Sequence, residues 1–225
     1  MSDFREGYID GYCDAATDAD TYSVAGCGCV SDAKVFGLQS SIRRAKYPMA
    51  ADVKVVNSEL TNGIVKLAQS GRGEGHDQFL TGIIVQFDLT FSNKAWVECE
   101  RYHFIDFVSS QSTMHRMMRF DLDKAYNEFV DKQIIDRMKS LVNEYNKMLN
   151  EETPDEVLER KYLEVLYSNP AGFRLTAGMT TNYRQLKTIY HQRKNHRLPE
   201  WREFCTWIET LPSSELITGK RKESD

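Results

Sequence analysis

The stretch IIVQFDLTF, residues 83–91, decides the fold class of this chain. From Val85 onward its apolar residues recur at every second position, and polar residues occupy the positions between them. Successive side chains of a β-strand point to opposite faces. The alternation therefore predicts a strand that buries one face and exposes the other, as is typical of an antiparallel sheet. The face expected to be buried carries Val85, Phe87, Leu89 and Phe91.

Helical patterns dominate the sequence on both sides of this strand. Residues 31–46 begin with a capping Ser31 or Asp32, and residues 182–194 follow a capping Thr181 or Asn182. Few strands among many helices predict an α+β fold, a central antiparallel sheet with flanking helices. The same criteria predict further helices over residues 59–69, 93–102, 121–149, 153–169 and 199–209.

The two ends of the chain differ in composition from its middle. Residues 1–30 are rich in Asp, Gly and Ala and lack periodicity, so we predict an irregular N-terminal arm. Residues 213–225 are predicted to form a polar, mobile C-terminal tail. Between them, residues 31–212 are expected to form a single α+β domain.

Composition argues against two classes of partner. The 29 Lys and Arg against 33 Asp and Glu give a net charge of −4. A binder of polymeric nucleic acid needs a basic surface, so only a small phosphate ligand, held by a local basic patch, is expected. The sequence has no apolar run of 18 residues and no signal peptide at its polar start, so we expect no membrane partner and a cytoplasmic location.

The cysteines are expected to be free thiols, because their number is odd and no CxxC pair occurs. The pair Cys27-Gly28-Cys29 is compatible with a metal site or with a turn of small residues. No second cluster completes a metal site in the sequence, so we predict the turn and no metal. The full set is Cys13, Cys27, Cys29, Cys99 and Cys205.

The helix over 182–194 carries two arginines on opposite sides. Arg193 falls on the same face as Leu186, Ile189 and Tyr190, whereas Arg184 lies about half a turn away in angle. An arginine on a buried stripe needs an anionic partner. That partner is either a carboxylate of the core or a ligand. In the second case, the guanidinium would bind a phosphate or a nucleobase oxygen through two hydrogen bonds. Both interpretations remain open for Arg193.

Three other segments combine polar and basic residues. The run from Lys194 to Arg202 places cations beside Trp201, so it fits either nucleotide stacking or a solvated basic face. The segment 103–119 is rich in hydroxyls and arginines, which suits phosphate recognition, although hydroxyls also satisfy backbone groups in loops. The loop 75–79, Gly-His-Asp-Gln-Phe, enters the strand, a common position for ligand contacts.

These segments, in this order, resemble the flavin-dependent thymidylate synthases. The family has a Gly-His-x-x-Phe loop before an alternating strand, and Gly75-His76-Asp77-Gln78-Phe79 is similar. Its Arg-His-Arg and Ser-x-Arg-Tyr motifs correspond here to Tyr102-His103-Phe104 and Ser112-Thr113-Met114-His115. Its Asn-x-Arg-x-Leu helix, with an arginine nine residues after the first, corresponds to Asn182–Leu186 and Arg193. The likeness spans roughly residues 31–210.

The resemblance implies a homotetramer with active sites built between subunits. FAD and dUMP or a related pyrimidine deoxynucleotide would bind there, with NADPH as reductant and methylenetetrahydrofolate as carbon donor. By carry-over, the flavin-binding residues would be His76, Gln78, His103, Asn182 and Arg184. The substrate-binding residues would be Ser110, Ser112, Arg116 and Arg193, with Ser112 and Arg193 at the catalytic centre.

Departures from the family motifs leave two functions open. Tyr102 and Phe104 replace the arginines that flank the histidine, and Met114 stands where another arginine is expected. Arg101 and Arg116 are the nearest cations that could take over. The first function is reductive methylation of a pyrimidine deoxynucleotide by a phage-type member of the family, in which case its compartment would be the host cytoplasm. The alternative is a flavin-free nucleotide-binding paralogue that has lost catalysis.

Overall fold

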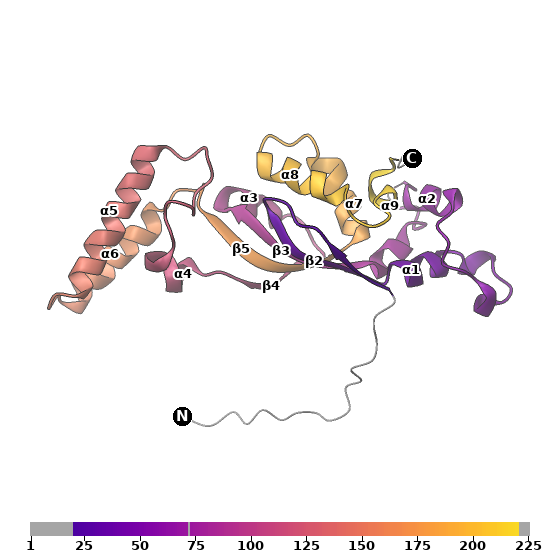
Figure 1. Ribbon diagram of the computed structural model, residues 1–225, viewed down its shortest axis with the longest axis horizontal. Coiled ribbons are helices and arrows are strands. Elements are labelled where there is room, and N and C mark those ends of the chain that lie inside the picture. The colour runs from indigo at the N-terminus through magenta and orange to yellow at the C-terminus, as the bar shows by residue number, and fades with distance from the viewer. Residues whose placement is uncertain (1–19, 72, 221–225) are drawn as a thin grey trace, which may run out of the picture.

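The computed structural model describes residues 20–71 and 73–220. A five-stranded antiparallel sheet runs through its middle in the order β1-β2-β3-β5-β4 (Figure 1). The alternating stretch forms β3, which lies at the centre of the sheet, so this expectation is confirmed. The strands are β1 Thr21–Val24, β2 Val30–Phe36, β3 Ile84–Ser92, β4 Ile105–Ser110 and β5 Arg174–Asn182.

Some helices pack against the sheet and others lie beyond its two ends (Figure 1). This arrangement confirms the expected α+β class. The α-helices are α1 Leu38–Ala45, α2 Asn62–Ala68, α3 Asn93–Cys99, α4 Thr113–Arg116, α5 Lys132–Leu149, α6 Asp155–Ser168, α7 Tyr183–Arg193, α8 Pro199–Ile208 and α9 Glu215–Thr218. The short 3-10 helices are η1 Tyr47–Met49, η2 Val53–Val55, η3 Gln78–Gly82 and η4 Met117–Arg119. No helix in these described ranges is long and apolar enough to cross a membrane.

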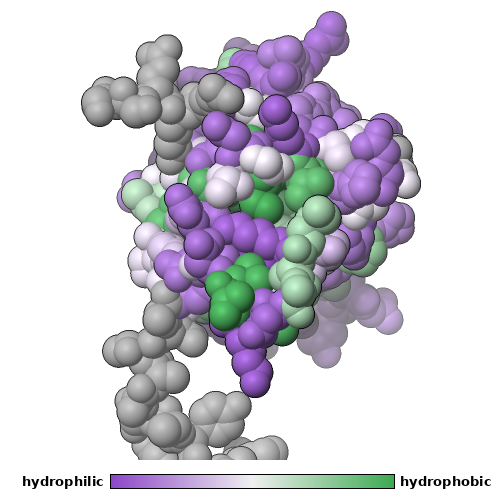
Figure 2. Space-filling view, turned by 90° about the vertical axis from the view of Figure 1, so that its right-hand side faces the viewer, coloured by the Kyte–Doolittle hydropathy of each residue, from purple (hydrophilic) through white to green (hydrophobic). Residues whose placement is uncertain are grey.

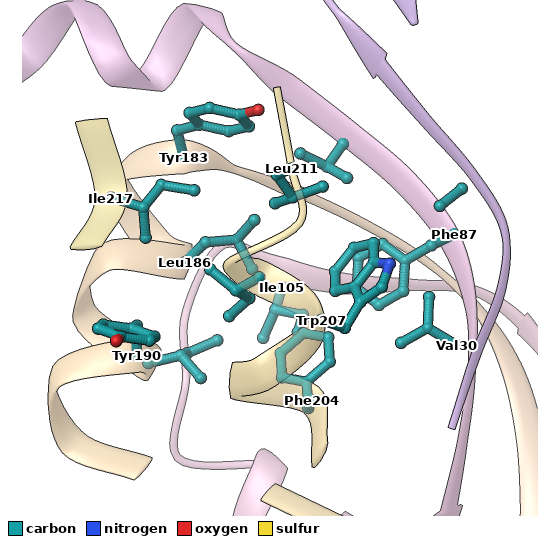
Figure 3. Packing of buried hydrophobic residues seen from close by; sticks show 14 of the residues in the cluster. Val30, Phe87, Ile105, Tyr183, Leu186, Tyr190, Phe204, Trp207, Leu211 and Ile217 are labelled. Carbon is teal, nitrogen blue, oxygen red and sulfur yellow. The ribbon is translucent and has the colours of Figure 1, made fainter. Parts of the chain in front are cut away.

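The core lies between the buried face of β3 and helices α7 and α8. Phe87 packs against Phe204 and Trp207 of α8, with ring centroids 5.7 and 5.2 Å apart (Figure 3). Leu186 and Tyr190 of α7 complete this core, and both are almost fully buried. Burying large apolar side chains is the main source of stability for such a domain, and it fixes α7 and α8 on one side of the sheet.

The helix predicted over residues 31–46 was wrong in its first half. Residues Val30–Phe36 form β2, with Ala33 and Val35 in the core and Lys34 exposed. Gly37, at φ 74°, then separates the strand from α1. Alternation with period two was present here, but Val35, Leu38 and Ile42 also matched helical spacing. Pairing of β2 with both β1 and β3 decides between the two patterns.

The predicted arm and tail are partly wrong. Residues 1–19 lie outside the described residues, but Thr21–Val24 form β1, the edge strand beside β2. In the tail, α9 buries Leu216 and Ile217 completely. The side chain of Gln69 also donates a hydrogen bond to the carbonyl of Leu216, at 2.8 Å. Two apolar residues within a polar segment are enough to dock it onto α2 and α7.

Helices α5 and α6 form a hairpin that extends away from one end of the sheet (Figure 1). The hairpin has its own apolar cluster, which includes Met138, Leu141 and Val165 and joins Phe173 at the start of β5. The long helix predicted over 121–149 begins only at Lys132, because Asp131 caps it by accepting a hydrogen bond from the Gln133 backbone at 2.7 Å. Residues 121–131 form turns instead.

Candidate functional site

One end of the sheet gathers all the residues predicted to bind the cofactor. β3 begins at Ile84, which pairs with Asn182, and β4 begins at Ile105, which pairs with Thr181. His103 and Asn182 therefore lie at the same end of the sheet. The short helix η3, which starts at Gln78, leads into β3 at this end. Figure 2 looks onto this end of the molecule, where hydrophilic surface surrounds smaller hydrophobic patches.

Arg184 is held in place by the loop before β3. Its Nε donates to Asp77 Oδ1 at 3.1 Å, and its Nη1 donates to Gln78 Oε1 at 2.8 Å. Asp77 is buried and also binds Lys187, whose Nζ lies 2.9 Å from Oδ2. The side chain of Arg184 still keeps 38% of its surface exposed. One carboxylate thus orients two cations, and the arginine remains accessible to a ligand.

The other residues predicted to bind the cofactor differ in their hydrogen bonding and in their exposure to solvent. The Oδ1 of Asn182 accepts a hydrogen bond from the Gln185 backbone at 2.9 Å, which caps α7 as expected. His76 and His103 are exposed. Phe104 is 68% exposed and has φ 62°, an unusual conformation for a bulky residue. The end of the sheet therefore presents two imidazoles, an aromatic ring and a fixed guanidinium to solvent.

Arg193 lies in a closed cage of protein groups. Its Nε donates to the hydroxyl of Tyr102 at 2.6 Å, and its Nη1 donates to Glu98 Oε2 at 2.7 Å. The same Nη1 lies 2.7 Å from Nε2 of His196, and the guanidinium sits 5.0 Å from the ring centroid of Trp201. In the folded chain the guanidinium of Arg193 is therefore paired with a carboxylate of the protein. Binding of a nucleotide would have to rearrange the cage, and that role stays a prediction.

Electrostatics favour the charged state of the cage. Burial opposes ionisation of Glu98, but the hydrogen bond and charge of Arg193 outweigh it and lower the pKa of that carboxyl. Burial also disfavours the charged form of Arg193, but its hydrogen bonds and charge interactions with Tyr102 and Glu98 outweigh burial and raise its pKa. Burial raises the pKa of the Tyr102 phenol, so the phenol stays neutral and accepts from the guanidinium.

This shift predicts a pH dependence of stability. Because the pKa of Glu98 is lower in the folded chain, its contribution is present above the ordinary glutamate pKa of about 4.3 and is lost as pH falls below it. We expect Glu98→Gln to cost about 1.5 kcal/mol at pH 7, the value of a charged hydrogen bond. The cost should shrink near pH 3.5. Urea unfolding of both proteins at the two pH values measures it, and an equal cost at both would contradict the assignment.

Three of the four residues predicted to bind the substrate lie at the other end of β4, whereas the fourth, Arg193, lies in the cage. Ser110 ends this strand opposite Ala177, and Ser112 and Arg116 follow it. A strand rises roughly 3.3 Å per residue, so Ser112 is on the order of 20 Å from His103. Ser110 and Arg116 are exposed, and Ser112 is half-buried. Within one chain these residues cannot share a ligand with the histidines.

A cavity of about 550 Å³ opens between the start of α8 and the chain before α5. Its lining includes the cations Lys94, Arg197 and Arg202, and the ring of Phe129, which is 69% exposed. Oε1 of Glu200, another lining residue, is buried and has no hydrogen-bond partner among the described residues. The basic run after α7 therefore borders a hollow that has the size and charge for a nucleotide.

Comparison with solved structures identifies the fold. A flavin-dependent thymidylate synthase from Helicobacter pylori, crystallised with FAD and dUMP, matches over 89% of this chain and 98% of its own, with a TM-score of 0.59 and 13% identity. The chain has the fold of a flavin-dependent thymidylate synthase. A second structure of the Helicobacter pylori enzyme with FAD and dUMP matches over 86% of this chain and 97% of its own, at TM-score 0.59 and 14% identity.

The likeness is one of structure rather than sequence. No family model and no curated protein matches the chain. The thymidylate synthase fold nevertheless covers 89% of the chain, so the fold class expected from a few short motifs is confirmed. Sequence reasoning missed Asp77 and Glu98, the carboxylates that hold Arg184 and Arg193. The position of Asp77 between His76 and Gln78 was the available signal for the first.

Proposed function

We propose that the chain is a flavin-dependent thymidylate synthase-type enzyme that reductively methylates dUMP or a related pyrimidine deoxynucleotide. One observation supports this function most directly. The five residues matched to flavin-binding positions converge on one end of a sheet whose fold is shared with a synthase that was crystallised with FAD and dUMP. NADPH and methylenetetrahydrofolate are the co-substrates this activity requires.

The residues at this end fit a flavin. Arg184 offers a half-exposed guanidinium that Asp77 and Gln78 already orient, which limits the entropy lost on binding an anion. His76, His103 and Arg101 are exposed nearby in the chain and can supply further donors for the phosphates. Phe104 provides an exposed ring for stacking. A flavin bound there would supply the reducing equivalents of the methylation.

The test is direct. Purified protein should bind FAD near micromolar concentration, seen as quenching of flavin fluorescence, and should convert dUMP to dTMP when both co-substrates are added. Binding without turnover would place the chain among proteins that retain the cofactor but not the chemistry. Absence of binding at about 100 µM FAD, a ceiling of roughly 5.5 kcal/mol on the affinity, would contradict the flavin proposal.

We further propose that the working form is a homotetramer. The proposed flavin residues and the proposed substrate residues Ser110, Ser112 and Arg116 lie at opposite ends of β4, so a site that contains both sets needs segments from more than one chain. The exposed apolar side chains of Phe107 and Val108 on this edge strand are suited to burial in such an interface. Light scattering should give four times the 26.0 kDa chain mass at micromolar concentration. A mass of one chain would contradict the shared site.

The alternative function, a flavin-free nucleotide binder, is favoured by the cavity beside α8. Its three cations and exposed Phe129 could hold a nucleotide within a single chain. If this function is the correct one, Arg197→Ala should weaken dUMP binding roughly 10-fold or more, the effect of losing a charged hydrogen bond. Arg184→Ala should leave dUMP affinity unchanged. Calorimetric titration of the two variants separates the functions, since the enzyme proposal predicts that Arg184→Ala acts on the flavin.

A further inference from the structure

The turn between β1 and β2 brings two thiols together on a well-fixed backbone. The Sγ atoms of Cys27 and Cys29 lie 3.5 Å apart. The backbone N–H of Cys27 donates to the Val30 carbonyl at 2.9 Å, and the Cys29 carbonyl accepts from the Thr90 backbone at 2.8 Å. Two thiolates that share a tetrahedral zinc ion are about 3.8 Å apart, given Zn–S bonds of about 2.3 Å. The spacing therefore suits a shared metal and exceeds the roughly 2.0 Å of a disulfide.

A carboxylate from a distant part of the chain completes the group. Glu203 projects from α8, and its carboxylate oxygen and the two sulfur atoms all lie within 4.8 Å of one another. The approach depends on Gly28, because a Cβ at that position would lie 2.4 Å from Glu203 Oε1. Within residues 20–71 and 73–220, Glu203 forms no salt bridge. Among the described residues, this carboxylate thus lies beside two thiols without a cation to balance it.

We propose that Cys27, Cys29 and Glu203 bind a thiophilic divalent cation of the zinc type. Two sulfur ligands select zinc over magnesium or calcium, and the carboxylate oxygen is a common third ligand. Three protein ligands leave a fourth position for water. On binding, the two thiols become thiolates and release their protons to solvent, so that two thiolates and one carboxylate surround the 2+ ion.

The metal would join two parts of the fold that lie far apart in the sequence. It would connect the turn before β2 to α8, alongside the hydrogen bond from Trp207 Nε1 to the Ala25 carbonyl at 3.1 Å. The site lies at the end of β2 opposite the proposed flavin residues, since Val30 pairs with Leu89 and Phe36 pairs with Ile84. It is therefore independent of the proposed flavin chemistry. Its role there is structural, a clip between sheet and helix.

The experiment titrates chelator-treated, reduced full-length protein with Zn²⁺ and, separately, with Co²⁺. We expect one ion per chain, a sulfur-to-cobalt charge-transfer band in the near ultraviolet, a higher melting temperature with Zn²⁺, and release of about two protons in calorimetry. Loss of an outer-shell partner already weakens metal affinity 10- to 100-fold. Removing a direct ligand in Cys27→Ser or Glu203→Gln should therefore weaken binding by about 100-fold or more.

The matched control is Cys205→Ser, which changes a buried cysteine of the same helix outside the group. It should bind Zn²⁺ with unchanged affinity. Glu203 and Cys27 are exposed, so their variants are expected to fold, as circular dichroism would verify. No Zn²⁺ binding at about 100 µM, affinity unaltered by both ligand variants, or a Cys27–Cys29 disulfide that persists in reductant would each overturn the proposal.

Discussion

Replacing Arg193 with alanine is expected to destabilise the fold by about 3 kcal/mol. Removing one member of a buried ion pair costs about 3–5 kcal/mol, because its partner stays buried without a counter-charge. The lower end applies here, since the side chain of Glu98 is 20% exposed. Contact with the Trp201 ring adds to the loss. For a chain of this size, the change corresponds to a melting temperature lower by roughly 6–12 °C.

Two variants sharpen this measurement. Arg44→Ala removes an exposed guanidinium whose hydrogen bond, within the part of the chain that the structure describes, goes to a carbonyl of its own helix, Ser40, and it should change stability by less than about 0.5 kcal/mol. The double variant Arg193→Met with Glu98→Met removes both charges and should recover much of the loss. If Arg193→Ala instead melts like the parent protein and loses only dUMP affinity, the guanidinium serves the nucleotide rather than the core.

Replacing Arg184 with alanine is expected to weaken FAD binding roughly 10- to 100-fold while the fold persists. The loss of a charge-assisted hydrogen bond costs about 1.5–3 kcal/mol. Arg184 is partly exposed, and its partner Asp77 keeps Lys187 as a second cation, so the variant leaves no carboxylate unpaired. Fluorescence titration with FAD, with and without dUMP, gives the affinity.

The matched control for Arg184 is Arg137→Ala on α5, which lies in the hairpin at the far end of the molecule (Figure 1). Arg137 is an exposed arginine with a carboxylate partner, Glu144, at 3.2 Å. Its loss should leave FAD affinity unchanged. Equal weakening by both substitutions would indicate a general effect of charge, and no weakening by Arg184→Ala would remove the arginine from the cofactor site.

The local sequence pattern was sufficient to predict the central strand and the helix that carries both arginines. β3 alternates from Val85 to Phe91, so its buried face could be predicted from the sequence. Asn182 caps α7, and Leu186, Ile189 and Tyr190 are buried as their spacing indicated. Both signals arise from residues within a few positions of each other, and a single sequence contains them in full.

Partners distant in the chain could not be predicted in this way. Whether Arg193 meets a carboxylate or a ligand depends on Glu98, which is distant in the chain and is brought near only by the tertiary fold. The pair Cys27 and Cys29 gained its third candidate ligand from α8, a helix at the other end of the sequence. Likewise, residues 30–36 fit two periodicities, and only pairing with β1 and β3 selects the strand.

The sequence by itself thus determined the α+β class, the central strand and the capped helix, because periodicity and capping are local properties. The tertiary structure alone decided which carboxylates hold Arg184 and Arg193, and at which ends of the sheet the residues predicted to bind flavin and substrate lie. The physical reason is that charge pairing and ligand geometry depend on contacts between segments far apart in the chain, and the packing of the core sets those contacts.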